Sequence, residues 1–180
     1  HNRMIVPYKG ELFNIIYSFH LPLFFLLSGI FINYNCSLLE IIIKKIDSYI
    51  KPYLVVLTSY SIFLVLHDDS NPILYFFKIL YGTGPSIPLE WKPLWFLPHL
   101  WAVSFFSYLC YRYMKLESRP LVFKIFFLIS FLTIGVLGIR AFWDTALPGT
   151  HHHFWGLPFS FDIVLVTSFY FLLGSFLKKY

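Results

Sequence analysis

The 180-residue chain is 58% hydrophobic and 22% aromatic, while only 13% of its residues are charged. A soluble domain carries about 25% charged residues, so this composition excludes an ordinary soluble protein and indicates a polytopic α-helical membrane protein. The net charge of +5 arises from basic clusters between apolar runs. That pattern is typical of membrane topology signals and argues against a nucleic-acid-binding face. The two cysteines, Cys36 and Cys110, have no metal-ligand spacing.

The apolar stretches predict an all-α transmembrane helix bundle that forms a single domain over residues 1–180. A helix needs about 20 apolar residues to cross a bilayer. We expect spans at about 12–34, 52–67, 93–113, 121–139 and 158–177. The apolar segment 71–82 is too short to cross and predicts an interfacial or re-entrant helix. Since the chain starts at a histidine and ends directly after a span, we expect a fragment that lacks the first helix and later helices.

The distribution of lysine and arginine predicts the orientation of these spans. If the first span runs from outside to inside, nine of the 14 basic residues fall on one side and five on the other. Cytoplasmic loops carry the excess of such residues, so the richer side is predicted to be cytoplasmic. The expected location is therefore an integral, multi-pass position in the cell membrane, with a bacterial inner or plasma membrane favoured. The predicted inner residues are Lys44, Lys45, Lys51, Arg112, Lys115, Arg119, Lys124, Lys178 and Lys179.

The first span contains a histidine two positions before a proline, His20 and Pro22. Pro22 cannot donate to the carbonyl of Ser18, so we expect the helix to bend there and to open a cavity. An ionisable side chain inside a membrane is costly and indicates a function. The alternative is a structural histidine that bonds a neighbouring helix or the carbonyl freed by the proline.

Three separated segments resemble the acyltransferase 3 family of membrane acyltransferases, especially its branch near the fucose 4-O-acetylases. The first is Ile16–Gly29, which reads IYSFHLPLFFLLSG. The second is the basic connector with Lys44-Lys45 and then Lys51-Pro52-Tyr53-Leu54, and the third is LWFLP at 94–98. LPFSFD at 157–162 is a weaker fourth match. His99 departs from the pattern, because the family more often has a small or apolar residue there.

The resemblance implies an acyltransferase for groups other than amino-acyl groups. The expected reaction moves acetyl from acetyl-CoA to a hydroxyl of a cell-surface carbohydrate. His1 resembles the histidine of the family's Gly-His pair, which implies that it is the catalytic base. His20 is then a second catalytic or positioning residue. Neutral imidazole suits this role because its pKa lies near the working pH.

The resemblance also implies binding residues. Lys44, Lys45 and Lys51 would contact acyl-CoA, although topology signalling alone explains loop lysines. Trp95 and Phe96 would form a wall of the substrate pocket, although an aromatic belt is the alternative. The complete set expected in the substrate pocket is Tyr17, Ser28, Trp95 and Phe96.

The expected partners are the lipid bilayer, acyl-CoA and a sugar or glycolipid acceptor, with no nucleic acid. No bound cofactor is expected, and no metal, because the side chains of the consecutive residues 151–153 cannot easily converge on one ion. Asp162 is expected to pair with Arg140 or a loop histidine. This stretch alone is expected to be inactive, because helices of the family bundle are missing from it.

Two other classes of protein stay open from the sequence. One is a fragment of a multi-span transporter or flippase with His20 as a proton relay. Transporters tend to show internal repeats, and none is visible in this sequence. The other is an inactive relative with a sensing role.

Overall fold

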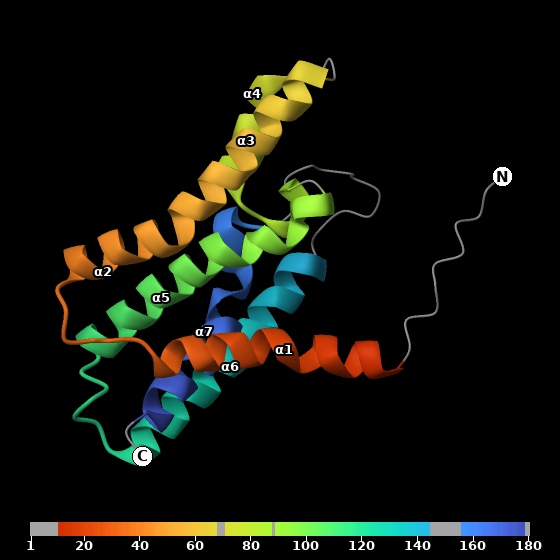
Figure 1. Ribbon diagram of the computed structural model, residues 1–180. Helices are drawn as coiled ribbons and strands as arrows, with labels where there is room; N and C mark the ends of the chain where they lie inside the picture. Colours follow the sequence, from red (N-terminus) through yellow and green to blue (C-terminus); the bar gives the residue numbers. More distant parts are fainter. Residues whose placement is uncertain (1–10, 68–70, 88, 145–155, 179–180) are drawn as a thin grey trace.

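The computed structural model describes residues 11–67, 71–87, 89–144 and 156–178, apart from some side chains such as those of 11–18 and 141–144 (Figure 1). All regular elements within these ranges are helical, which confirms the predicted fold class. The α-helices are α1 (Glu11–Ile30), α2 (Leu38–Lys45), α3 (Lys51–His67), α4 (Pro72–Tyr81), α5 (Phe96–Tyr113), α6 (Leu121–Asp144) and α7 (Val164–Leu177).

Two helical stretches in the described part of the chain are long and apolar enough to cross a membrane, Leu121–Arg140 and Pro158–Leu177. A shorter apolar helix covers Phe19–Ile30. The predicted number of five spans therefore stays a prediction. Two of the expected spans begin as 3-10 turns, at Leu89–Trp95 before α5 and at Pro158–Ile163 before α7.

The first helix ends earlier than the sequence predicts, at Ile30 instead of residue 34. A local turn follows, in which the Asn33 side-chain oxygen accepts a hydrogen bond from the Asn35 amide at 3.0 Å. Asparagine side chains compete with the helix for backbone partners in this way. The sixth helix instead runs past the predicted end at 139 and continues to Asp144.

The basic connector that contains Lys44 and Lys45 and the span predicted at 52–67 form one continuous helical path. The Ser37 hydroxyl caps α2 by accepting from the Glu40 amide, and a π-helical turn at Ile46–Ile50 joins α2 to α3. The short helix α4 then folds back alongside α3 (Figure 1). The Tyr53 hydroxyl ties the two helices together by donating to the Ile79 carbonyl at 2.6 Å.

Helices α1 and α7 pack against each other more extensively than any other pair of elements. Two glycines make their crossing possible. A Cβ atom at Gly29 would lie 1.8 Å from the Phe171 carbonyl oxygen, and one at Gly174 would lie 1.9 Å from that of Leu26. Small residues that let helix backbones approach closely are typical of helix contacts in membranes. The buried rings of Phe25 and Phe171 fill the core beside this crossing.

The ends of α1, α5 and α7 and the start of α6 lie together at one end of the bundle (Figure 1). We call this the inner end, because the charge pattern predicts it to be cytoplasmic. Long-range hydrogen bonds fasten the chain there. The Lys178 amine donates to the Ile32 carbonyl at 3.0 Å, and the Tyr108 hydroxyl donates to the Cys36 carbonyl at 2.7 Å.

The glycine crossing predicts a specific stability pattern. Gly174→Ala should lower the free energy of unfolding by about 2 kcal/mol, because the added methyl group must push two backbones apart. Gly138→Ala on α6 is the matched control, since a Cβ atom there meets nothing within 4 Å. Thermal unfolding in detergent measures both variants. Equal midpoints for the two would contradict the close crossing.

Candidate functional site

The histidine-proline segment of α1 packs directly on the LWFLP segment that leads into α5. The ring of Phe96 lies 5.7 Å from that of Phe24 and 5.2 Å from that of Phe25, measured between centroids. The Phe25 ring also meets the His99 ring edge-on, at 5.4 Å and 87°. The structure thus brings together two segments that lie far apart in the sequence.

His20 is half-buried on α1 and lies one helical turn before Phe24, which contacts Phe96. His20, Phe24 and Ser28 are spaced four residues apart, and residues so spaced share one helix face. Phe24 contacts Phe96, so His20 and Ser28 lie on the same stripe, one turn to either side of that contact. The helix continues through Pro22 as one element.

Of the other residues predicted at the site, the structure describes the side chains of some and not of others. The Trp95 and Phe96 side chains are half-buried at the start of α5, and the Trp95 ring lies 5.5 Å from the His99 ring. His1 and the side chain of Tyr17 lie outside the described residues. The structure therefore brings Phe24, which is one helical turn from both His20 and Ser28, against Phe96, while the roles of His20, Ser28, Trp95 and Phe96 stay predictions.

His99 is a polar residue that sequence reasoning noted without giving it a role. Its side chain is completely buried between α1, α5 and α7. Nδ1 lies 2.8 Å from the Phe159 carbonyl oxygen and Nε2 lies 3.0 Å from the Thr167 hydroxyl. Its departure from the family pattern is the one sequence signal that pointed to it.

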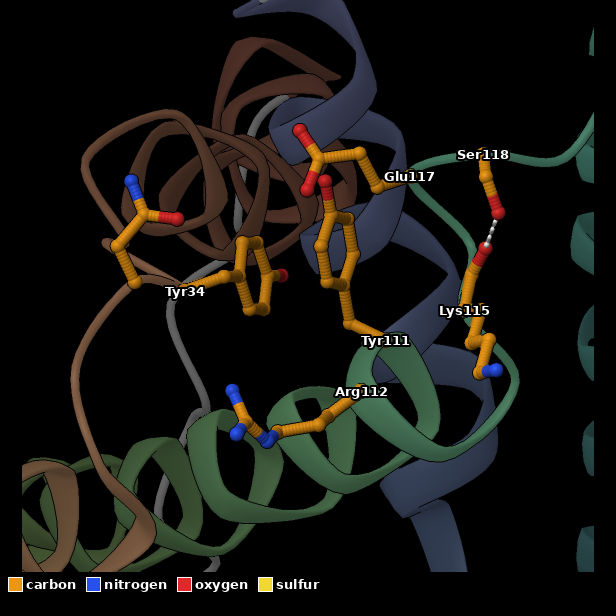
Figure 2. Close-up of a pocket in the computed structure, with 7 residues that line it drawn as sticks. Tyr34, Tyr111, Arg112, Lys115, Glu117 and Ser118 are labelled. Atoms are coloured by element: carbon orange, nitrogen blue, oxygen red, sulfur yellow. Dashed lines mark hydrogen bonds between the residues drawn. The ribbon is translucent and has the colours of Figure 1, made fainter.

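Two pockets open at the inner end, on either side of the loop that follows α1. The larger has a volume of about 590 Å³ (Figure 2). Its aromatic part is formed by Tyr34 and Tyr111, whose rings stack at 3.7 Å with 8° between their planes. Figure 2 shows the Arg112 guanidinium extending toward the Tyr34 side of this space. The lining residues are Tyr34, Asn35, Tyr111, Arg112, Lys115, Glu117 and Ser118.

The backbone of Lys115 has an unusual conformation for its residue type. Its φ angle is 50°, in the left-handed region. The Leu116 amide donates to the Tyr111 carbonyl and the Lys115 amide donates to that of Arg112, at 3.0 and 3.3 Å. This is a Schellman helix end, in which glycine is the usual residue at the left-handed position. A lysine in this conformation costs about 1–2 kcal/mol in backbone strain. The Lys115 side chain adds a positive charge to the wall of the larger pocket.

The smaller pocket, of about 220 Å³, contains two of the three lysines predicted to contact acyl-CoA, Lys44 and Lys45. Lys44 pairs with Glu40 at 2.7 Å, and this hydrogen bond and the lysine charge hold the pKa of the Glu40 carboxyl below its usual value. The Lys45 amine donates to the Tyr49 hydroxyl at 3.0 Å. Lys51 is not among the residues that line either pocket, and it pairs with Asp47.

The expected absence of a metal site stays a prediction. Among the described residues, no three His, Cys, Asp or Glu side chains are grouped so that they could hold a metal ion. The histidines at 151–153 lie outside those residues. Asp162 stabilises its own turn, because its Oδ1 atom accepts from the Leu157 amide at 3.0 Å. Its predicted pairing with Arg140 or a loop histidine stays a prediction.

Comparison with known proteins adds one match. No curated protein and no solved structure matches the chain. The family model described as an acyltransferase domain, that of the acyltransferase 3 family, matches residues 1–180 and so covers the whole chain. The chain therefore belongs to the acyltransferase 3 family of membrane acyltransferases.

Proposed function

We propose that this chain is part of an O-acyltransferase that moves acetyl from acetyl-CoA to a hydroxyl of a cell-surface carbohydrate. The observation that carries the proposal is the position of α1. Its histidine-proline segment packs on the LWFLP segment through Phe24 and Phe96, and its inner end opens on two pockets with basic side chains. The family match favours acyl transfer over transport. The acceptor class is inferred only from the resemblance of the sequence segments to the fucose 4-O-acetylase branch.

The inner pockets suit the donor because coenzyme A carries phosphate groups. The guanidinium of Arg112 offers a planar fork of donors that matches a phosphate, while Lys44, Lys45 and Lys115 act as point charges. Both pockets border the loop at 31–36, so one extended donor could reach both. We propose that the phosphates of acetyl-CoA bind in these pockets and that its thioester reaches into the bundle along α1.

The proposed reaction needs a base and a leaving group. A histidine accepts the proton of the acceptor hydroxyl as its oxygen attacks the thioester carbonyl carbon. The new carbon–oxygen bond forms, the carbon–sulfur bond breaks, and the released thiolate takes up the proton. His1 has the predicted role of base, and His20 assists it or positions the reacting groups. No redox partner is required.

Replacing His20 tests the site. His20→Ala in the complete protein should lower acetyl transfer by roughly 10²–10⁴-fold, because a positioned acid–base group contributes that much. The matched control is Thr133→Ala on α6, an exposed residue whose hydroxyl bonds only its own helix at Ile129. Transfer is measured in membranes that contain equal amounts of each variant. Near-normal turnover of the His20→Ala variant would show that His20 is not part of the catalytic site.

The donor pockets give a second prediction. The double substitutions Lys44→Gln with Lys45→Gln, and Arg112→Gln with Lys115→Gln, should each raise the KM for acetyl-CoA roughly tenfold or more, because hydrogen bonds to charged groups contribute about 1.5–3 kcal/mol. kcat should change little. Lys92→Gln is the control, since this exposed lysine precedes α5 at its opposite end. An unchanged KM, in protein of correct orientation, would exclude phosphate binding there.

The reaction and the acceptor are tested together by mass spectrometry of surface glycans from cells with and without the gene. The expected result is the loss of one acetyl group from a defined sugar when the gene is deleted. The His20→Ala allele should reproduce that loss. Identical glycans in all three strains would reject the proposed acceptor class.

A further inference from the structure

The turn that leads into α7 is held in a strained conformation. Phe159 and Ser160 both have left-handed backbones, with φ angles of 55° and 56°. For residues with a Cβ atom this conformation costs about 1–2 kcal/mol each. Such strain persists only where the surroundings determine the conformation, and it is concentrated at functional sites. The contacts that hold this turn are therefore informative.

Three hydrogen bonds fix the turn. The Ser160 amide donates to the Leu157 carbonyl at 2.8 Å, and the Leu157 amide donates to the Asp162 carboxylate at 3.0 Å. The third comes from outside the turn, where His99 Nδ1 lies 2.8 Å from the Phe159 carbonyl oxygen. A carbonyl can only accept, so Nδ1 carries the proton. In a neutral ring, Nε2 is then an acceptor 3.0 Å from the Thr167 hydroxyl, whose one proton is also within reach of the Ile163 and Val164 carbonyls at 3.1 Å.

The same imidazole contacts Trp95, a residue predicted to line the substrate pocket, and Phe25 of α1. Its ring lies 5.5 Å from the Trp95 ring, while the Phe25 ring packs against it edge-on. Because His99 is completely buried, its ring has no room to move independently of these neighbours. His99 thus contacts both the strained turn and the Trp95 ring, which also packs against the cluster of Tyr53, Leu57, Ile79 and Ile87.

The turn also determines how the buried segment at 82–84 packs. The Phe159 side chain lies against Gly82, where a Cβ atom would come within 2.8 Å of its ring. The Phe159 ring meets the Trp101 ring at 6.1 Å and 70°. Gly82 begins the buried segment at 82–84, which precedes the LWFLP segment in the chain. A shift of the turn would therefore move Phe159 and loosen this segment.

We propose that His99 is a positioning residue that locks the Phe159–Ser160 turn and thereby fixes the Trp95 side chain, the predicted wall of the substrate pocket, which we assign to the acceptor. The assignment of this wall to the acceptor rests on the proposed function. The lock itself rests on the hydrogen bond from Nδ1 and on the strain of the turn. A small or apolar residue at this position would leave the Phe159 carbonyl without its donor. His99 thus acts on the affinity for the acceptor and not on the chemical step.

The kinetic test compares two amides in the complete protein. Asparagine can place its amide N–H near the position of Nδ1 and restore the bond to Phe159, whereas glutamine reaches toward Thr167. His99→Ala and His99→Gln should raise the KM for the acceptor roughly tenfold, as expected for a buried carbonyl left unsatisfied. The KM for acetyl-CoA should stay within about twofold, and His99→Asn should recover most of the acceptor affinity. Equal defects in the Asn and Gln variants would overturn the proposal.

The structural test does not depend on activity. His99→Ala should increase hydrogen exchange of the Ser160 amide, and adding Ser160→Gly should reverse part of that increase, since glycine adopts a positive φ without strain. Unchanged exchange in His99→Ala would overturn the lock even if acetyl transfer is normal. A wild-type protein that shows the lock but transfers no acetyl would reject the proposed function and leave the lock supported.

Discussion

The packing of α1 against the rest of the helix bundle depends on the close crossing of α1 and α7. Gly29 and Gly174 allow each helix to approach a backbone carbonyl of the other, at Phe171 and Leu26. This contact fixes the rotation of α1 about its own axis. With that rotation the buried Phe25 ring faces the start of α5, and the stripe with His20 and the mostly exposed Phe24 lies at the edge of this contact, where Phe24 also meets Phe96. A larger residue at the crossing would therefore disturb the site through geometry, without touching it.

The bundle has chemically different ends. The inner end has Arg112, Lys115, Lys44 and Lys45 in the walls of two pockets, whereas the other end holds aromatic rings around a buried histidine. His20 stands ten residues before the end of α1 at Ile30, which places it about 15 Å from the inner pockets along the helix axis. Under the proposed function, a donor bound at the inner end would have to extend into the bundle to meet an acceptor near His20. This separation suits a reaction that joins a cytoplasmic donor to an external acceptor.

The sequence predicts the helices better than the contacts that join them. Apolar length and the family-like segments were sufficient to place α1, α5, α6 and α7. Apolar periodicity does not reveal that α1 ends at Ile30, before the turn in which Asn33 accepts from the Asn35 amide. The left-handed Lys115 and the bond from His99 to Phe159 break local expectations for their residue types. The pairing of Gly29 with Gly174 needs knowledge of which helices touch, and no local pattern gives it.

The most direct test of the account is chemical cross-linking between α1 and α5 in intact membranes. Cysteines replace Phe24 and Phe96, whose rings lie 5.7 Å apart, in a protein whose Cys36 and Cys110 are changed to alanine. A control pair joins position 24 to the exposed Ile134 of α6. The account predicts rapid linkage by a short bifunctional thiol reagent for the first pair and little for the second. Equal rates of linkage for the two pairs, or no linkage of the first pair, would contradict the contact between α1 and the start of α5.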